Sequence, residues 1–112
     1  MKLGKICKGR NCSYSVSFSR SNPSPWRPAL ILTELEGDDL ILCQITSQGI
    51  KDKYAIPLND DNFETGGLKQ PSNVRPNRIF TADTHLVLYR TGKLKAEKLA
   101  EVIERVIEII RK

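Results

Sequence analysis

The sequence is short of the residues that most often carry catalysis. It holds one histidine, His85, among 112 residues, which excludes a mechanism that uses two histidines as acid and base. It has no glycine-rich phosphate loop and no His/Cys cluster at metal-ligand spacing, so we predict no cofactor and no metal site. No apolar run approaches the roughly 18 residues of a membrane span, and no apolar signal segment follows the N-terminal lysines.

Acidic residues are missing from the N-terminal part of the chain. The first is Glu34, whereas the whole chain has 18 Lys and Arg against 13 Asp and Glu, a formal net charge of +5. This excess favours an anionic partner but does not by itself identify nucleic acid. The three cysteines are an odd number, and Cys7 and Cys12 have no metal-binding companions. Because Cys43 lies in an apolar run, it is predicted to be a buried free thiol in the reducing cytoplasm.

The chain is organised around residues 26–48. Two apolar runs, residues 29–33 and 40–45, flank the acidic turn Glu-Gly-Asp-Asp at 36–39, which predicts a β-hairpin. Arg27 precedes the hairpin, and the polar residues 46–48 follow it. One interpretation is a site for chemistry on a phosphate. The alternative is a surface charge and a turn, because polar strand ends are common.

The length predicts one domain over residues 1–112. We expect further strands at residues 54–58, 79–81 and 86–89, turns at 66–68 and 90–92, and a polar loop at 59–65. Residues 94–111 carry one apolar stripe of helical period, with glutamates on the other side. This helix is expected to cover one face of the sheet; the alternative is a partner-binding helix. The predicted class is α+β, mainly antiparallel β, with the C-terminal helix closing a small sheet or barrel.

Residues 10–25 form an atypical N-terminal segment, rich in serine and without an acid. Tyr14, Val16 and Phe18 alternate with serines, a strand pattern, and the segment ends in Pro-rich sequence. The pattern is compatible with a weak edge strand followed by a loop, and the composition is compatible with a poorly ordered segment.

Four motifs in order give the chain a family resemblance. The runs RPALIL, LILCQITSQ, GGLKQPSNVRP and FTAD, followed by the amphipathic helix, resemble the MazF/PemK family of toxin endoribonucleases. The match covers residues 26–112, about three quarters of the chain. The resemblance implies a small SH3-like barrel, which this family shares with the CcdB gyrase poisons, and a homodimer. It also implies a toxin that pairs with a cognate antitoxin, whose flexible acidic segment covers a basic groove. A cytoplasmic protein without a membrane contact agrees with the cysteines and with the absence of a long apolar run.

The resemblance assigns roles to particular residues. RNA cleavage by attack of the neighbouring 2′-OH needs a base, donors for the developing phosphorane charge and an acid, and an arginine with a hydroxyl can supply these without a metal. Arg27 matches the family's arginine before the proline, expected to contact the scissile phosphate and to transfer protons. Thr46 matches the hydroxyl expected to stabilise the transition state. The remaining residues expected to contact single-stranded RNA are Ser47, Gln48, Ser72, Arg75, Asn77, Arg78 and Asp83.

The sequence departs from the family pattern at one site position. Members known as ribonucleases often carry an arginine where this chain has Phe80, although Asp83 is retained. This leaves a second hypothesis open, a catalytically inactive relative that binds antitoxin or RNA. A third, a topoisomerase-inhibiting toxin on the same barrel, is disfavoured because RPAL and ITSQ belong to the ribonuclease branch.

The N-terminal segment departs further. The family places an acidic residue and an apolar strand after Lys-Gly, but residues 10–25 after Lys8 and Gly9 contain neither. Residues 9–22 read GRNCSYSVSFSRSN. Codons that encode this peptide can, when read one nucleotide forward, encode EEIVLIPFPFPDL, which is the kind of sequence that the family has at this place. We therefore hypothesise that residues from about Arg10 to Pro25 are a frameshifted translation, with the frame restored just before Trp26. Resequencing the gene tests this.

Overall fold

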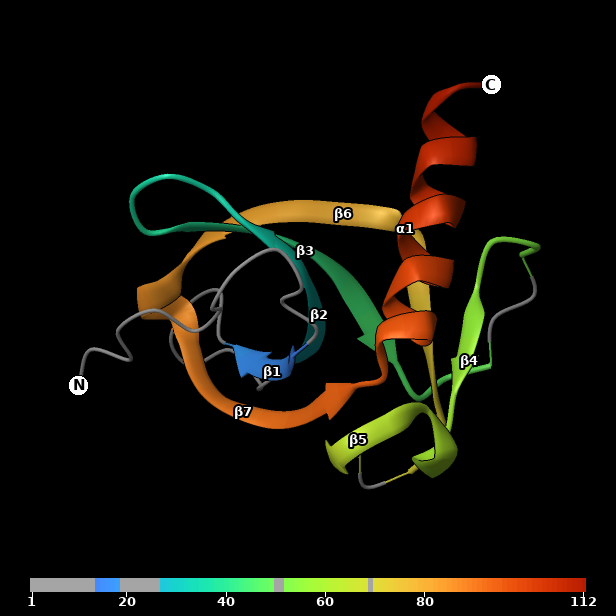
Figure 1. Cartoon of the computed structure of the whole chain (residues 1–112), viewed down its shortest axis with the longest axis horizontal. Helices are drawn as coiled ribbons and strands as arrows, with labels where there is room; N and C mark the ends of the chain where they lie inside the picture. Colours follow the sequence, from blue (N-terminus) through green and yellow to red (C-terminus); the bar gives the residue numbers. More distant parts are fainter. Residues whose placement is uncertain (1–13, 19–26, 50–51, 69) are drawn as a thin grey trace.

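A computed structural model gives the fold and describes residues 14–18, 27–49, 52–68 and 70–112. Seven strands form one antiparallel sheet in the spatial order β4-β6-β3-β2-β1-β7-β5. The sheet curls into a half-barrel, and the C-terminal helix α1 packs against it (Figure 1). The predicted mainly antiparallel barrel closed by a C-terminal helix is therefore confirmed.

The elements follow the chain in a simple order. The strands are β1 (Tyr14–Phe18), β2 (Arg27–Glu34), β3 (Asp39–Thr46), β4 (Ile56–Leu58), β5 (Phe63–Gly66), β6 (Ser72–Asp83) and β7 (Val87–Leu94). Two short 3-10 helices, η1 (Asp60–Asn62) and η2 (Thr84–Leu86), precede β5 and β7, and α1 spans Ala96–Ile110.

The central hairpin is formed by β2 and β3, as predicted. Gly37 adopts a φ of +78°, a left-handed conformation that glycine reaches at little cost, in the predicted turn. The Leu35 N–H donates to the Asp39 carbonyl at 2.9 Å and closes the turn. Both strands of the hairpin lie inside the sheet, because β2 also pairs with β1 and β3 also pairs with β6.

The hairpin separates two apolar clusters. Ala29 and Ile31 belong to a cluster on one face of the sheet, whereas Leu30 belongs to a cluster on the other face. The second cluster is covered by α1 through Leu99 and Val102. Since β2 and β3 are buried on both faces, the residues at their ends are held on a rigid base. Among the described helices, none combines the length and apolar character needed to cross a membrane.

Several predicted elements are wrong in detail. Residues 59–65, expected to be a polar loop, contain η1 and the start of β5, and residues 90–92, expected to be a turn, lie within β7. β7 continues through this Gly-containing segment because it pairs with β1 on one side and β5 on the other. The brief run at 79–81 is part of the longer β6, and the strand expected at 54–58 begins only at Ile56. The helix expected from residue 94 begins at Ala96, because Leu94 ends β7.

β1 is an inner strand, which corrects the prediction of an edge strand. It lies between β2 and β7 and pairs with both, and Ser15, Val16 and Ser17 are buried. The Ser15 hydroxyl lies 2.7 Å from the Thr91 hydroxyl, so one buried polar group on this strand has a partner. The rest of the segment at 10–25, and with it most of the frameshift hypothesis, lies outside the described residues.

Cys43 is fully buried in the second cluster, and burial raises the pKa of its thiol to about 12. At pH 8 the reactive thiolate of such a group is roughly a thousandfold or more rarer than that of an exposed cysteine. We therefore expect Cys43 to react with a maleimide about a thousandfold more slowly in the native protein than in urea. Peptide mass spectrometry separates it from Cys7 and Cys12. Equal rates in both conditions would contradict its place in the core.

Candidate functional site

The ends of three neighbouring strands bring polar residues together. The β2–β3 register pairs Ala29 with Gln44. Continued by two residues on each strand, this register brings the start of β2 at Arg27 beside the end of β3 at Thr46. On the other side of β3, Gln44 pairs with Arg75 and Thr46 pairs with Asn73. Directly paired residues project from the same face of a sheet. We call the set Arg27, Gln44, Thr46, Asn73 and Arg75 the polar patch.

The hydroxyl and amide groups after β3 border this patch. Arg27 is exposed and Thr46 is half-buried, while Ser47 and Gln48 are exposed. The Thr46 hydroxyl oxygen accepts a hydrogen bond from the Gln48 N–H at 3.2 Å, which fixes the first turn after the strand. The structure thus brings four of the predicted site residues, Arg27 and residues 46–48, to one end of the sheet.

Arg75 is held by a carboxylate that the sequence did not point to. Its Nη2 lies 3.2 Å from Asp52 Oδ2, and 18% of its side-chain surface is exposed. Its Nε is buried and has no hydrogen-bond partner among the described residues. Part of the guanidinium is therefore fixed, and donors remain for another group.

Asp52 also organises its own turn. Its Oδ1 accepts hydrogen bonds from the Tyr54 N–H at 2.9 Å and the Ala55 N–H at 3.0 Å. Partial burial alone would raise the pKa of Asp52, but these two bonds, together with the bond and charge of Arg75, outweigh it and lower the pKa. The carboxylate is consequently ionised at neutral pH.

Asn77 and Arg78 reach the site region from a bulge in β6. Cys43 pairs with Ile79 and the next residue of β3 pairs with Arg75, so residues 76–78 have no direct partner on β3. Pro76 is buried, whereas Asn77 and Arg78 are exposed. Since bulges re-aim side chains next to functional sites, these two remain candidate RNA contacts beside the polar patch.

Two predicted site residues lie elsewhere. Ser72 is buried and pairs with Leu58 of β4. Because it lies two residues before Val74, its side chain is on the same face as the helix-covered cluster. The Ser72 hydroxyl donates to the Gln70 carbonyl at 3.0 Å. Asp83 pairs with Asp39, at the opposite end of β3 from Thr46, about 23 Å away at the usual rise per residue. Neither side chain joins the polar patch.

Asp83 caps the short helix η2 instead. Its Oδ1 accepts a bond from the His85 N–H at 2.8 Å and lies 2.6 Å from His85 Nδ1. The His85 N–H and the charge of His85 lower the pKa of Asp83. Ligand atoms of Asp38, Asp83 and His85 lie within 4.8 Å of one another. Asp38 and His85 are exposed and Asp83 is half-buried. The contact between Asp83 and His85 follows from the cap of η2, and the group lies at the opposite end of β3 from Thr46.

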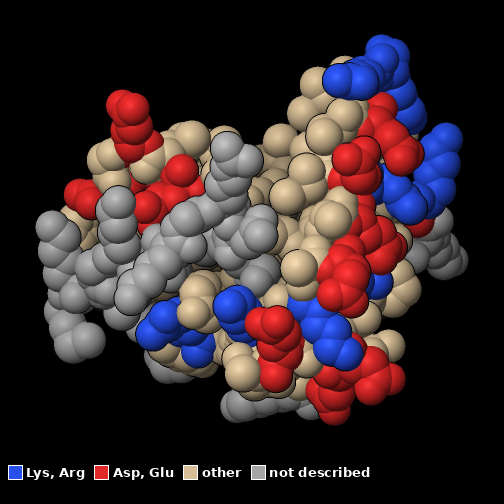
Figure 2. Space-filling model, viewed as in Figure 1, with Lys and Arg blue, Asp and Glu red and all other residues tan. Residues whose placement is uncertain are grey.

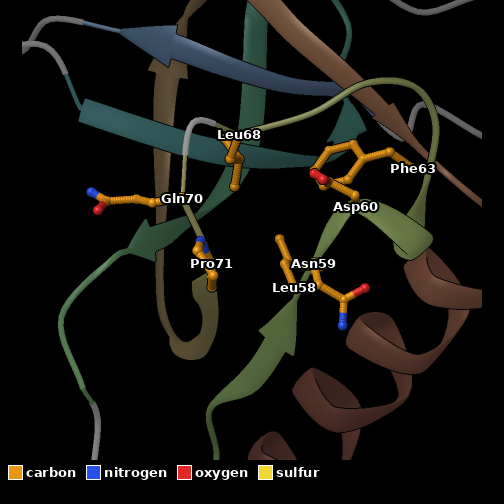
Figure 3. A pocket seen from close by; sticks show the side chains of 7 residues that line it. All are labelled: Leu58, Asn59, Asp60, Phe63, Leu68, Gln70 and Pro71. Carbon is orange, nitrogen blue, oxygen red and sulfur yellow. The ribbon is translucent and has the colours of Figure 1, made fainter.

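A small cavity opens on the helix side of the sheet. It has a volume of about 130 Å³ and contains none of the predicted site residues (Figure 3). Its lining residues are Leu58, Asn59, Asp60, Phe63, Leu68, Gln70 and Pro71. Because Leu58 and Phe63 belong to the helix-covered cluster, the cavity and the polar patch lie on opposite faces.

Acidic side chains occupy two separate regions of the face shown in Figure 2. Acidic side chains gather over the β2–β3 turn and along α1, and a surface without charged side chains lies between them (Figure 2). The turn carries Glu36, Asp38 and Asp39, at the end of β3 opposite Thr46. The acidic end of the hairpin is thus separate from the end that carries Arg27.

Sequence reasoning missed Gln44, Asn73 and Asp52. A polar residue two positions before Thr46 in an apolar strand is a weak signal for Gln44, because alternate residues share a face. Asn73 and Asp52 gave no such signal, since they reach the site through the pairing of β3 with β6 and through a turn.

The comparisons with known proteins agree with this fold. The solved structure of the Mycobacterium tuberculosis toxin MazF-mt6 is 19% identical, with a TM-score of 0.69, and the match covers 88% of this chain and 96% of that one. The crystal structure of an Mtb toxin is 20% identical, with a TM-score of 0.65 and coverages of 84% and 97%. An endoribonuclease in complex with its cognate antitoxin, from a mycobacterial species, is 10% identical, with a TM-score of 0.66 and coverages of 88% and 91%. At these identities the solved structures support the fold alone.

The family itself is identified by a family model. No curated protein matches the chain. The model of the PemK-like, MazF-like toxins matches residues 14–110, from the first described strand to the end of α1. This confirms the family resemblance of the sequence motifs. The chain therefore belongs to the PemK-like, MazF-like toxins of type II toxin–antitoxin systems.

Proposed function

We propose that the protein is a metal-independent endoribonuclease toxin that cleaves single-stranded RNA by attack of a 2′-OH on the adjacent phosphate. The observation that supports the proposal is the pairing of Ala29 with Gln44, which, continued to the ends of both strands, brings Arg27 and Thr46 to the same end of the sheet. A guanidinium and a hydroxyl on rigid strands can donate to the same phosphate. Family membership supports the reaction class, because this is a family of endoribonuclease toxins.

The proposed roles follow from side-chain chemistry. Arg27 contacts the scissile phosphate and takes part in proton transfer, and Thr46 donates to the charge that develops on the phosphorane. Ser47, Gln48, Arg75, Asn77 and Arg78 contact the RNA, and Gln44 and Asn73 line the same patch. We do not include Ser72 and Asp83 among the RNA contacts, because Ser72 is buried and Asp83 lies at the opposite end of β3 from Thr46.

Cleavage of a labelled pool of single-stranded RNA in EDTA tests this function. The wild-type protein is expected to cut at a short preferred sequence, and the cuts are expected to persist under chelation because the donors are protein groups. Purified Arg27→Ala protein serves as the control for a contaminating nuclease. No cleavage by the wild type, or cleavage only with added Mg²⁺, would contradict the proposal.

A second candidate function is favoured by Phe80. This residue replaces the arginine that many ribonuclease members carry, and its side chain packs against the apolar cluster that contains Ala29 and Ile31. An inactive relative that binds antitoxin or RNA would bind without cutting. Binding of RNA by both the wild type and the Arg27→Ala variant, with no cleavage by either, would favour this alternative.

We further propose a cognate antitoxin as the partner and the cytoplasm as the site of action. The third solved structure contains a toxin of the same fold bound to its own antitoxin, and we extend that pairing to this chain. An acidic antitoxin segment would cover the exposed cations Arg27 and Arg78. Co-expression with the neighbouring gene is expected to relieve growth arrest.

The homodimer is proposed from an apolar surface. Ile79 on β6 is 44% exposed and Ile110 at the end of α1 is 67% exposed, while Ile103 and Ile107 are half-buried. Isoleucines exposed on one protomer can be covered by a second copy. Sedimentation equilibrium is expected to give twice the chain mass, and a monomer at micromolar concentration would contradict this.

A further inference from the structure

We propose that Asp52 is a positioning residue that presents the Arg75 guanidinium to the RNA phosphate next to Arg27 and Thr46. This inference rests on the proposed function. The carboxylate of Asp52 has two tasks, one for each oxygen. Oδ1 closes the turn at residues 52–55, and Oδ2 lies 3.2 Å from Arg75 Nη2. Asp52 thus joins a turn to a strand that borders the polar patch.

The turn is itself fixed to the helix. Arg105 Nη1 on α1 donates to the carbonyl of Lys53 at 3.1 Å and lies 3.4 Å from that of Tyr54. The position of Asp52 is therefore set by backbone atoms and by a helix packed on the core. A carboxylate held from two sides can hold a long side chain such as Arg75 in one orientation.

Arg75 is placed to use that orientation. It pairs with Gln44, two residues along β3 from Thr46, which corresponds to about 7 Å along the strand. Only one of its nitrogens is bonded to Asp52, and the Nε has no partner among the described residues. A guanidinium has five N–H donors in a fixed fork, so donors remain for a phosphate. Because an arginine side chain loses rotamer freedom when it binds, prior orientation lowers that cost at the moment of reaction.

The proposal predicts opposite effects of Asp52 on binding and on cleavage. Replacing Asp52 by asparagine removes a negative charge beside a site for an anion, so RNA is expected to bind as tightly or up to about threefold more tightly. The same change releases Arg75, so cleavage is expected to slow because misplaced catalytic donors are costly. A carboxylate that served only folding would alter both quantities in the same direction, through a loss of folded protein.

Asp52→Asn is a suitable variant because its side-chain oxygen can still accept the Tyr54 and Ala55 N–H groups. We expect kcat to fall about tenfold or more, while the Kd for a 2′-deoxy oligonucleotide that cannot be cut stays the same or falls by up to about threefold. The melting temperature is expected to stay within a few degrees. Asp61→Asn, at an exposed acidic residue of η1, is the matched control and is expected to cleave like the wild type.

A double variant tests whether Asp52 acts through Arg75. Arg75→Ala is expected to cleave more slowly and to bind more weakly. Adding Asp52→Asn to Arg75→Ala is expected to have no further effect on kcat, because the group that Asp52 orients is gone. Independent, multiplying losses in the double variant would overturn the proposed route.

The outcomes separate this inference from the function on which it rests. A wild type that cleaves, with Asp52→Asn cleaving equally well, overturns the positioning role alone. Parallel losses of cleavage, binding and melting temperature in Asp52→Asn also overturn it, because they indicate a folding role. A wild type that neither cleaves nor binds RNA overturns the proposed function and this inference together.

Discussion

The Arg27→Ala variant is expected to cleave RNA about a thousandfold more slowly than the wild type, with little change in stability. Removing a single preorganised donor to a transition-state anion costs roughly 10²–10³ in kcat, and loss of a proton-transfer group adds to this. Arg27 is exposed at the start of β2, so its removal leaves the two apolar clusters intact. Single-turnover cleavage of a labelled RNA containing the preferred sequence measures the effect.

Two further variants show whether the geometry of Arg27 matters or only its charge. Arg27→Lys keeps the charge but loses the fork of donors, and is expected to remain about a hundredfold slower than the wild type. Arg111→Ala, at an exposed arginine beyond the end of α1, changes the net charge equally and is expected to retain full activity. Equal losses in Arg27→Ala and Arg111→Ala would indicate general electrostatics and would contradict a catalytic Arg27.

The Gly92→Ala variant is expected to lose about 3 kcal/mol of unfolding free energy, the upper part of the range for overpacking. Gly92 lies on β7, where it pairs closely with Gly66 of β5. A Cβ there would stand 2.7 Å from the Gly67 backbone nitrogen, 2.9 Å from the Phe63 ring and 3.0 Å from the Thr65 carbonyl oxygen. Two of these atoms are backbone, so the clash can be relieved only by moving β5.

Thermal unfolding measures this second effect. A loss of about 3 kcal/mol corresponds to a fall in Tm of roughly 10 °C for a domain of this size. Gly49→Ala is the matched control, because a Cβ at Gly49 meets nothing within 4 Å and its backbone is not in the left-handed region. We expect its Tm to stay within about 2 °C of the wild type. Equal Tm values for the two variants would contradict the close pairing of β5 with β7 at Gly92.

Some of this structure could be predicted from local pattern. The hairpin followed from two apolar runs around a Gly-containing acidic turn, and α1 followed from a stripe of period 3.6. The same hairpin register places Arg27 and Thr46 at its open end, so the main pair of the proposed site was within reach of sequence reasoning. The family motifs in this stretch pointed to the same two residues.

The remaining features depend on pairing between distant segments. β5 lies in a polar, acidic stretch with little strand propensity, and it forms because it pairs with β7. The bulge at residues 76–78 divides β6 into two paired parts, residues 72–75 and 79–83, and no local pattern indicates it. The contact of Asp52 with Arg75 spans 23 positions in the sequence. Ser72 and Asp83, which were predicted from family motifs, lie away from the polar patch. Ser72 is on the helix-covered face of the sheet, and Asp83 is at the opposite end of β3 from Thr46.

The most direct test of the central claim is a comparison of two RNA substrates in EDTA. One carries the preferred sequence in all-ribose form, and the other has a single 2′-deoxy sugar on the 5′ side of the scissile phosphate. We predict that the wild type cuts the first, leaving a 2′,3′-cyclic phosphate and a 5′-hydroxyl, and leaves the second intact. Equal cleavage of both substrates would contradict attack by the 2′-OH, and a lack of cleavage of either would contradict a metal-independent ribonuclease.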